Sequence, residues 1–218
     1  MYFFDLDGTL LDSNGIWLDI DIAFLGRHGV KRVPEDYTDY VTHHAFSDAA
    51  EYTRTYFDLP LTPEEIVAAW HDLAQDAYAS QLPLKPGALD FLTRAKEAGK
   101  RCALLTSCMP RLCQGAVDRH GLSPLLEEIF TTARLGLEKR DPELYRQVAK
   151  LCGERPEDCI LFDDSPVYCA AAKEAGWHIY GVADPIFADR AEEMIQLCGP
   201  DRFPFSFFGP LPEQSFHT

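Results

Sequence analysis

The sequence is poor in basic residues and has no long apolar segment. Its 218 residues include 20 Lys and Arg against 35 Asp and Glu, which gives a formal net charge of −15. Because such a chain repels phosphate backbones and anionic lipids, we expect neither a nucleic acid nor a membrane surface as a partner. No apolar run approaches the ~18 residues that a membrane-spanning helix requires. The segment Met1-Tyr-Phe-Phe-Asp5-Leu-Asp7 lacks the basic region of a secretory signal peptide.

Cysteine pairs with metal-binding spacing are also missing. The 7 cysteines are odd in number and include no Cys-x-x-Cys pair, which argues against a disulfide framework and a zinc ribbon. Most lie among apolar residues, where a free thiol behaves as a small hydrophobic side chain. Reduced thiols are typical of cytosolic proteins, so we expect a cytoplasmic location. The sequence has no low-complexity segment, and its 46% of hydrophobic residues exclude a disordered chain.

Short apolar segments alternate with helical patterns along most of the chain. Their nearly continuous apolar character is typical of strands buried on both faces. Helix signals lie between them, such as Asp141-Pro142 at a start and Gly153 at an end. This alternation predicts an α/β fold with a doubly wound, Rossmann-like parallel sheet. We expect the strands at residues 2–5, 101–106, 128–131, 159–163 and 177–182.

Residues 15–84 interrupt this alternation, because they contain helical signals and no convincing strand. Thr62-Pro63-Glu64-Glu65 is a capping box, and apolar residues at helical spacing follow it. A single crossover between parallel strands needs far fewer residues, so we expect an inserted helical cap with Trp17 and Trp70 in its interior. The predicted organisation is an α/β core at residues 1–14 and 85–198, a helical cap at 15–84, and a Pro- and Phe-rich tail at 199–218 that covers the core.

Polar residues follow four of the expected strands. Ligands of open α/β sheets bind at the carboxyl ends of the strands, so these residues should meet at one site. Asp5 and Asp7 are two positions apart in extended chain, and their carboxylates should therefore face the same way. In chain order the candidates are Asp5 and Asp7, then Thr106 and Ser107, then Lys139, and finally Asp163 and Asp164.

The residue types at these four loops predict phosphoryl chemistry. Carboxylates this close cannot all ionise without a cation between them. The oxygens offered are hard ligands, and no His or Cys belongs to the motifs, so Mg²⁺ is favoured over Zn²⁺. A lysine, two hydroxyls and the amides of helix N-termini suit a phosphoryl group.

Four motifs occur in a fixed order: Asp5-x-Asp7-Gly8-Thr9, Leu-Leu-Thr106-Ser107, Lys139 ahead of Asp-Pro-Glu-Leu-Tyr, and Phe-Asp163-Asp164-Ser165. In order and spacing they resemble the motifs of the haloacid dehalogenase-like hydrolases. The helical insert resembles the cap of the phosphoglycolate phosphatase and β-phosphoglucomutase branch. The likeness covers about residues 1–184.

The resemblance implies a role for each motif residue. Asp5 would be the nucleophile that forms an aspartyl-phosphate, and Asp7 would be the general acid and then the general base. The Asp5 carboxylate, the Asp7 carbonyl and Asp164 would hold Mg²⁺, with Asp163 bound directly or through water. The phosphate-binding groups would be Thr106, the Ser107 amide and Lys139.

We therefore expect a Mg²⁺-dependent phosphatase that acts on a small phosphorylated metabolite. One alternative is a sugar-phosphate mutase, which would need cationic cap residues for a second phosphate. Another is a non-catalytic regulator that binds a phosphorylated ligand, although loss of Asp5 or Asp7 would mark such a protein. Phosphonate or dehalogenase chemistry is a further alternative, but a dehalogenase has no need of Asp7.

Two residues near the motifs depart from the family pattern, and three others could be taken for a reactive thiol or a metal site. Arg140 follows Lys139 where proline is usual, and Met109 occupies a position that is polar or basic in some relatives. Cys108 adjoins the phosphate loop, and we expect it to be inert. The adjacent histidines His43 and His44 would point apart on a helix, so a shared metal ion is not expected.

Overall fold

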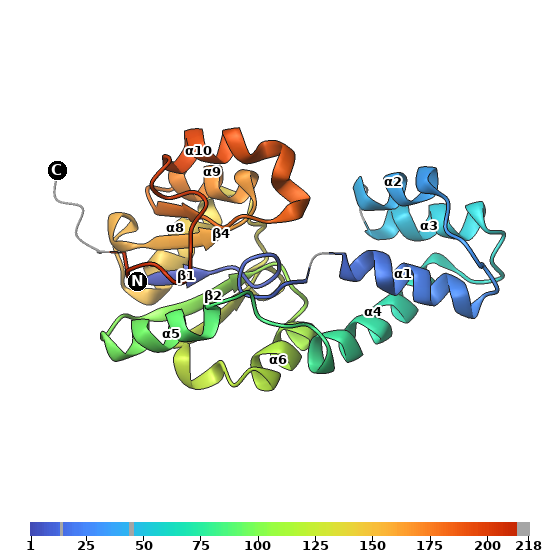
Figure 1. The fold of residues 1–218 in the computed structure, drawn as a ribbon, viewed down its shortest axis with the longest axis horizontal. Coiled ribbons are helices and arrows are strands. Elements are labelled where there is room, and N and C mark those ends of the chain that lie inside the picture. Colours follow the sequence, from blue (N-terminus) through green and yellow to red (C-terminus); the bar gives the residue numbers. More distant parts are fainter. Residues whose placement is uncertain (14, 44–45, 213–218) are drawn as a thin grey trace. The chain divides into compact units, whose positions relative to one another are not determined.

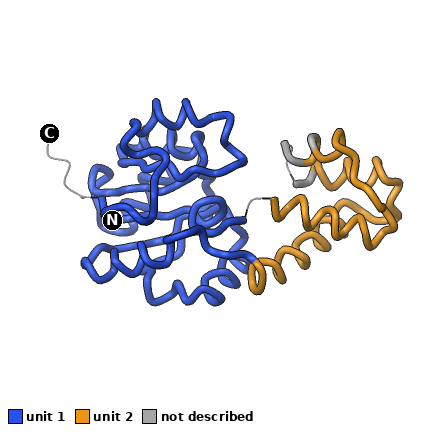
Figure 2. The backbone as a smooth tube through the Cα atoms, viewed as in Figure 1, with its two compact units in different colours: residues 1–14, 82–218 blue, residues 15–81 orange. Residues whose placement is uncertain are grey.

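The chain divides into two compact units (Figure 2). The computed structural model describes residues 1–13, 15–43 and 46–212. One unit comprises Met1–Asn14 and Leu82–Thr218, and the other comprises Gly15–Gln81. The second boundary therefore lies after residue 81, where the sequence pattern suggested residue 84.

A five-stranded parallel sheet forms the centre of the larger unit, in the order β3-β2-β1-β4-β5 (Figure 1). Each strand lies within a segment predicted from its apolar character, so the predicted α/β fold is confirmed. Because β1 lies between β2 and β4, the strand order reverses at the centre of the sheet. The strands are β1 (Tyr2–Phe4), β2 (Cys102–Thr106), β3 (Glu128–Thr131), β4 (Ile160–Asp163) and β5 (His178–Gly181).

Helices cover both faces of this sheet (Figure 1). Phe3, Leu105 and Leu161 belong to one buried cluster with residues of α8, α9 and α10. Successive strand residues alternate between faces, and so Tyr2 and Phe4 lie on the other face, against Phe91 of α5. The helices are α5 (Ala88–Glu97), α6 (Pro110–Arg119), α7 (Thr132–Leu135), α8 (Pro142–Cys152), α9 (Pro166–Glu174) and α10 (Ala191–Cys198), with 3-10 helices at Ser123–Leu125, Pro156–Asp158 and Pro185–Arg190.

The described part of the C-terminal tail packs on the second face. The Phe205 amide donates to the carbonyl of Gly181 at 2.8 Å. Its ring lies 5.4 Å from that of Phe91, and Phe207 is buried as well. Phe208, in contrast, is 71% exposed. The tail therefore supplies apolar cover that helix α5 alone does not provide.

The smaller unit contains four helices among the described residues: α1 (Ile16–Arg27), α2 (Glu35–His43), α3 (Phe46–Tyr56) and α4 (Pro63–Ser80). Thr62 and Glu65 form the predicted capping box at the start of α4. Phe24 and Trp70 are buried and lie edge to face at 6.0 Å. The prediction for Trp17 was wrong, since it is 37% exposed in the first turn of α1. His44 lies outside the described residues.

The two chain segments that lead to the helical unit are fixed to the larger unit. Leu11 and Leu84 form an antiparallel bridge, and the Lys85 amide donates to the Leu10 carbonyl at 2.8 Å. The Lys85 ammonium donates to the buried carboxylate of Asp184 at 2.7 Å. These contacts hold both segments in place up to the boundary between the units.

A buried carboxyl group, that of Asp21, lies inside the helical unit, where it is 4% exposed. Desolvation raises the pKa of Asp21 to about 6, and interactions with Tyr37 and Trp70 offset only part of this effect. An ionised Asp21 therefore destabilises the unit. Because the folded-state pKa lies above the unfolded value, the penalty is absent below about pH 4 and complete above about pH 6.

We expect Asp21→Asn to stabilise the protein at pH 7 by up to about 3 kcal/mol, because the amide has no charge to desolvate. At pH 4 the variant and the wild type should have similar free energies of unfolding. Urea denaturation at both pH values measures the difference. Asp19→Asn, at an exposed position of the same helix, is the control and should have little effect. A pH-independent effect of Asp21→Asn would contradict the assignment.

Candidate active site

The carboxyl ends of β1 and β4 meet at the point where the strand order reverses, which is the usual ligand site of such sheets. The Asp5 amide donates to the carbonyl of Phe162 at 2.9 Å, so the residue after β1 is fixed beside β4. Carboxylate oxygens of Asp5, Asp163 and Asp164 all lie within 4.8 Å of one another, and all three residues are buried. The structure thus brings together three of the four aspartates singled out in the sequence.

Lys139 reaches this cluster from the loop before α8. Its ammonium donates to Asp5 Oδ1 at 2.7 Å and to Asp163 Oδ2 at 2.6 Å, and its side chain is fully buried. Desolvation alone would lower the pKa of Lys139, but the charges of Asp163 and Asp5 outweigh it and raise the pKa well above its ordinary value. Lys139 is therefore a permanent cation within the cluster.

One lysine does not balance three carboxylates. Desolvation, together with the charges of Asp163 and Asp5, raises the pKa of Asp164. Desolvation also raises the pKa of Asp163, although Lys139 opposes this effect. A cation bound among the carboxylates would relieve the repulsion. All the donors offered are carboxylate oxygens, so the group fits a hard divalent ion.

The loop after β1 approaches Asp164 so closely that it requires glycine at position 8. Gly8 has a φ of +73°, and a Cβ there would lie 2.2 Å from Asp164 Oδ2. Its amide donates to Ser13 Oγ at 3.1 Å, and the Thr9 hydroxyl donates to Asp164 Oδ1 at 3.3 Å. The first motif thus orients the carboxylate of the fourth.

Asp7, which is half-buried, lies beside the thiol of Cys108. Desolvation and the charge of Asp7 raise the pKa of the Cys108 thiol, so it stays protonated and unreactive. The Cys108 amide donates to the Thr106 hydroxyl at 3.0 Å, which shapes the loop after β2. Ser107 is exposed at this loop.

The two other departures from the motifs are exposed to solvent. Arg140 is exposed and pairs with Glu138 at 2.7 Å. Met109 is 42% exposed. Among the described residues, Lys139 is the cation that pairs with the carboxylate cluster, whereas Arg140 pairs with Glu138.

Two tyrosines near Lys139 were not singled out from the sequence. The Tyr145 hydroxyl donates to the carbonyls of Lys139 at 2.9 Å and of Tyr168 at 3.1 Å. The ring of Tyr168 lies under the Lys139 ammonium, with 4.7 Å between Nζ and the ring centroid. In the sequence, the signal that could have identified Tyr168 as a site residue was its position in the first helical turn after Asp164.

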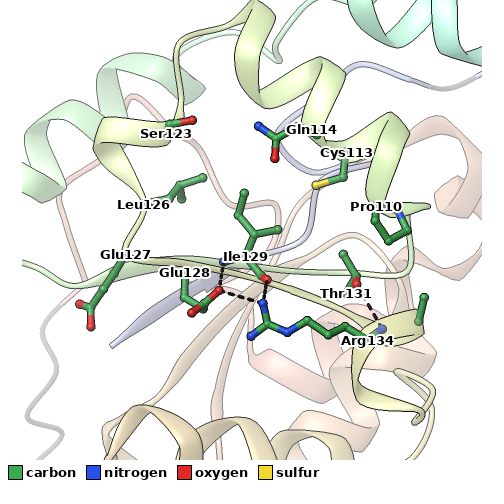
Figure 3. A pocket seen from close by; sticks show the side chains of 11 residues that line it. Pro110, Cys113, Gln114, Ser123, Leu126, Glu127, Glu128, Ile129, Thr131 and Arg134 are labelled. Atoms are coloured by element: carbon green, nitrogen blue, oxygen red, sulfur yellow. Dashed lines mark hydrogen bonds and ion pairs between the residues drawn. The ribbon is translucent and has the colours of Figure 1, made fainter.

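A hollow of about 680 Å³ lies elsewhere, between α6 and the edge strand β3 (Figure 3). Glu128 and Arg134 pair there at 3.1 Å and bind the amide and carbonyl of Ile129. Charged side chains that bind the backbone amides and carbonyls of an edge strand hinder the pairing of that strand with another chain. None of the candidate site residues lines this hollow.

Comparison with known proteins decides the family. Residues 1–176 match the family model described as haloacid dehalogenase-like hydrolase. The chain belongs to this family. It is 28% identical to hexitol phosphatase A of Escherichia coli (strain K12), over 88% of this chain and 87% of that protein. It is 31% identical to the GMP/IMP nucleotidase YrfG of the same organism, over 83% and 85%.

The haloacid dehalogenase-like fold also appears in the solved structures. A crystal structure from Thermotoga maritima, provisionally named a β-phosphoglucomutase, has a TM-score of 0.81 and 22% identity over 91% of both chains. The family and its phosphatase relatives make the protein a phosphomonoester hydrolase. No helix among the described residues is both long and apolar enough to cross a membrane. All 7 cysteines of this hydrolase are free.

We expect Lys139→Met to destabilise this hydrolase by about 3–5 kcal/mol, because it leaves buried carboxylates without their counter-charge. Urea denaturation in EDTA measures the effect of the protein's own charges. Arg140→Met is the matched control and should leave the free energy of unfolding nearly unchanged, since Arg140 is exposed. Equal effects of the two substitutions would show that the buried ion pairs contribute nothing.

Proposed function

We propose that the protein is a Mg²⁺-dependent phosphatase that hydrolyses a small phosphorylated metabolite through an aspartyl-phosphate on Asp5. The observation that carries the proposal is the buried group of Asp5, Asp163, Asp164 and Lys139 at the reversal point of the sheet. It combines a carboxylate nucleophile, a site that fits a divalent cation and a fixed positive charge.

The donor set accounts for the choice of metal. The carboxylates of Asp5 and Asp164 and the carbonyl of Asp7 would hold Mg²⁺, with Asp163 bound directly or through water. Bound Mg²⁺ would supply positive charge that offsets the negative charge of the transferring phosphoryl group.

The protein's own residues would carry the two chemical steps. A carboxylate oxygen of Asp5 attacks phosphorus, and the bond to the leaving oxygen breaks as Asp7 gives that oxygen a proton. Asp7 then takes a proton from a water molecule, whose oxygen attacks the phosphorus and releases Asp5. Lys139, the hydroxyl of Thr106 and the amide of Ser107 would hold the phosphoryl oxygens throughout.

The charge of the helical unit supports a substrate with an uncharged leaving group. Residues 15–84 carry 12 acidic and 4 basic side chains, a formal charge of −8. Arg54, the only base between residues 33 and 84, is exposed and pairs with Glu51 at 2.6 Å. A second phosphate or a carboxylate would be desolvated in that field at high cost. A neutral sugar or polyol monophosphate, or a nucleoside monophosphate, fits better, in keeping with the names of the two Escherichia coli relatives.

We expect Asp5→Asn to abolish phosphate release, because an amide is a poor nucleophile and a weaker metal ligand. Single-turnover and steady-state phosphate assays measure the loss. Asp12→Asn is the control, since Asp12 lies in the same segment but is exposed, and it should keep near wild-type kcat. Wild-type kcat in Asp5→Asn would exclude the covalent mechanism.

A panel of phosphorylated metabolites, assayed with Mg²⁺ and again with excess EDTA, tests metal and substrate together. Neutral sugar, polyol or nucleoside monophosphates should have a kcat/KM roughly tenfold above that of phosphoglycolate and of sugar bisphosphates. EDTA should abolish activity while the circular dichroism spectrum stays folded. Undiminished turnover in EDTA would contradict the metal requirement. A bisphosphate that leads the panel would favour the mutase alternative.

A further inference from the structure

Tyr168 is half-buried in the first turn of α9, four residues after Asp164, and its ring faces the ammonium of Lys139. The distance of 4.7 Å between Nζ and the ring centroid is within the range of a cation–π interaction. Asp5 and Asp163 accept hydrogen bonds from the same ammonium. Two carboxylates and one aromatic face therefore surround it.

Tyr168 also contacts the loop that carries Lys139 through its backbone. Its backbone carbonyl shares the hydroxyl of buried Tyr145 with the carbonyl of Lys139. Tyr168 is thus linked to the loop of Lys139 both through its ring and through the shared Tyr145 hydroxyl.

The flexibility of a lysine explains why such a contact matters. An ammonium on a four-carbon stem has many rotamers and three rotatable donors. Among the described residues two of these donors go to carboxylates, which leaves the third for a phosphoryl oxygen. A ring packed against the ammonium restricts the directions in which that donor can point.

We propose that Tyr168 is a positioning residue of the phosphatase site. Its ring directs the Lys139 ammonium. The inference rests on the proposed function, because it takes Lys139 to contact the transferring phosphoryl group. A purely structural role for Tyr168 predicts a different outcome, in which only stability changes.

Tyr180 provides a matched control. It is also half-buried, and its ring lies under a cation, with 5.3 Å between the Arg202 guanidinium and the ring centroid. Its neighbours are Phe162 and Phe205, on the face of the sheet that the tail covers. Tyr180→Leu therefore removes a comparable side chain without touching Lys139.

The kinetic test compares Tyr168→Leu, Tyr168→Phe and Tyr180→Leu with p-nitrophenyl phosphate and Mg²⁺. Tyr168→Leu should lower kcat about tenfold, the effect of losing a cation–π contact at a partly desolvated site. Tyr168→Phe, which keeps the ring, should retain kcat within about twofold. Tyr180→Leu should lower the melting temperature as much as Tyr168→Leu while kcat is unchanged.

Three results would overturn the proposal. They are a wild-type kcat in Tyr168→Leu, a loss of kcat in Tyr168→Phe as large as in Tyr168→Leu, and an equal loss in Tyr180→Leu. A wild-type enzyme that hydrolyses no member of the panel would instead refute the proposed function.

The position of Lys139 can be tested without turnover by ¹H–¹⁵N spectra of protein labelled with ¹⁵N-lysine. Lys139→Arg identifies the signal of the buried ammonium. We expect a slowly exchanging signal whose protons are shifted upfield by the ring of Tyr168. The shift should persist in Tyr168→Phe and in Tyr180→Leu and disappear in Tyr168→Leu. An identical signal in Tyr168→Leu would overturn the proposal whatever the activity.

Discussion

The Lys139 ammonium lies between the carboxylates of Asp5 and Asp163, at 2.7 and 2.6 Å, with no exposure to solvent. Buried charges are tolerated only when they are paired, so this contact determines what else the site can contain. Lys139 pairs with Asp5 and Asp163 but not with Asp164. The three carboxylates together therefore form a group that fits a divalent cation. The site thus combines a fixed positive charge with carboxylates that fit a divalent cation.

The strand order of the sheet explains how such a group is assembled. Asp5 directly follows β1, which has neighbours on both sides, so the carboxyl ends of β2 and β4 lie next to it. Gly8 lets the following loop approach Asp164, where any side chain would collide. Lys85 and Asp184 fix the segment that returns from the helical unit. The larger unit therefore contains every candidate catalytic residue.

The helical unit has a surplus of acidic side chains, and under the proposed function this charge disfavours a second anionic group on the substrate. Inside it, the ionised carboxyl of Asp21 weakens the packing near neutral pH. The stability of this unit should therefore fall as the pH rises from about 4 to about 6.

The sequence by itself determined the strands, the helical insert and the order of the four polar loops. These features are local, because continuous apolar runs, capping residues and the polar residues after a strand are visible within a few positions. The partners of Lys139 were decided by the tertiary structure, since Asp5 lies 134 residues away in the chain. The exposure of Arg140 and Trp17 and the contact between Tyr168 and Lys139 also depend on how distant segments pack, and no local pattern encodes those distances.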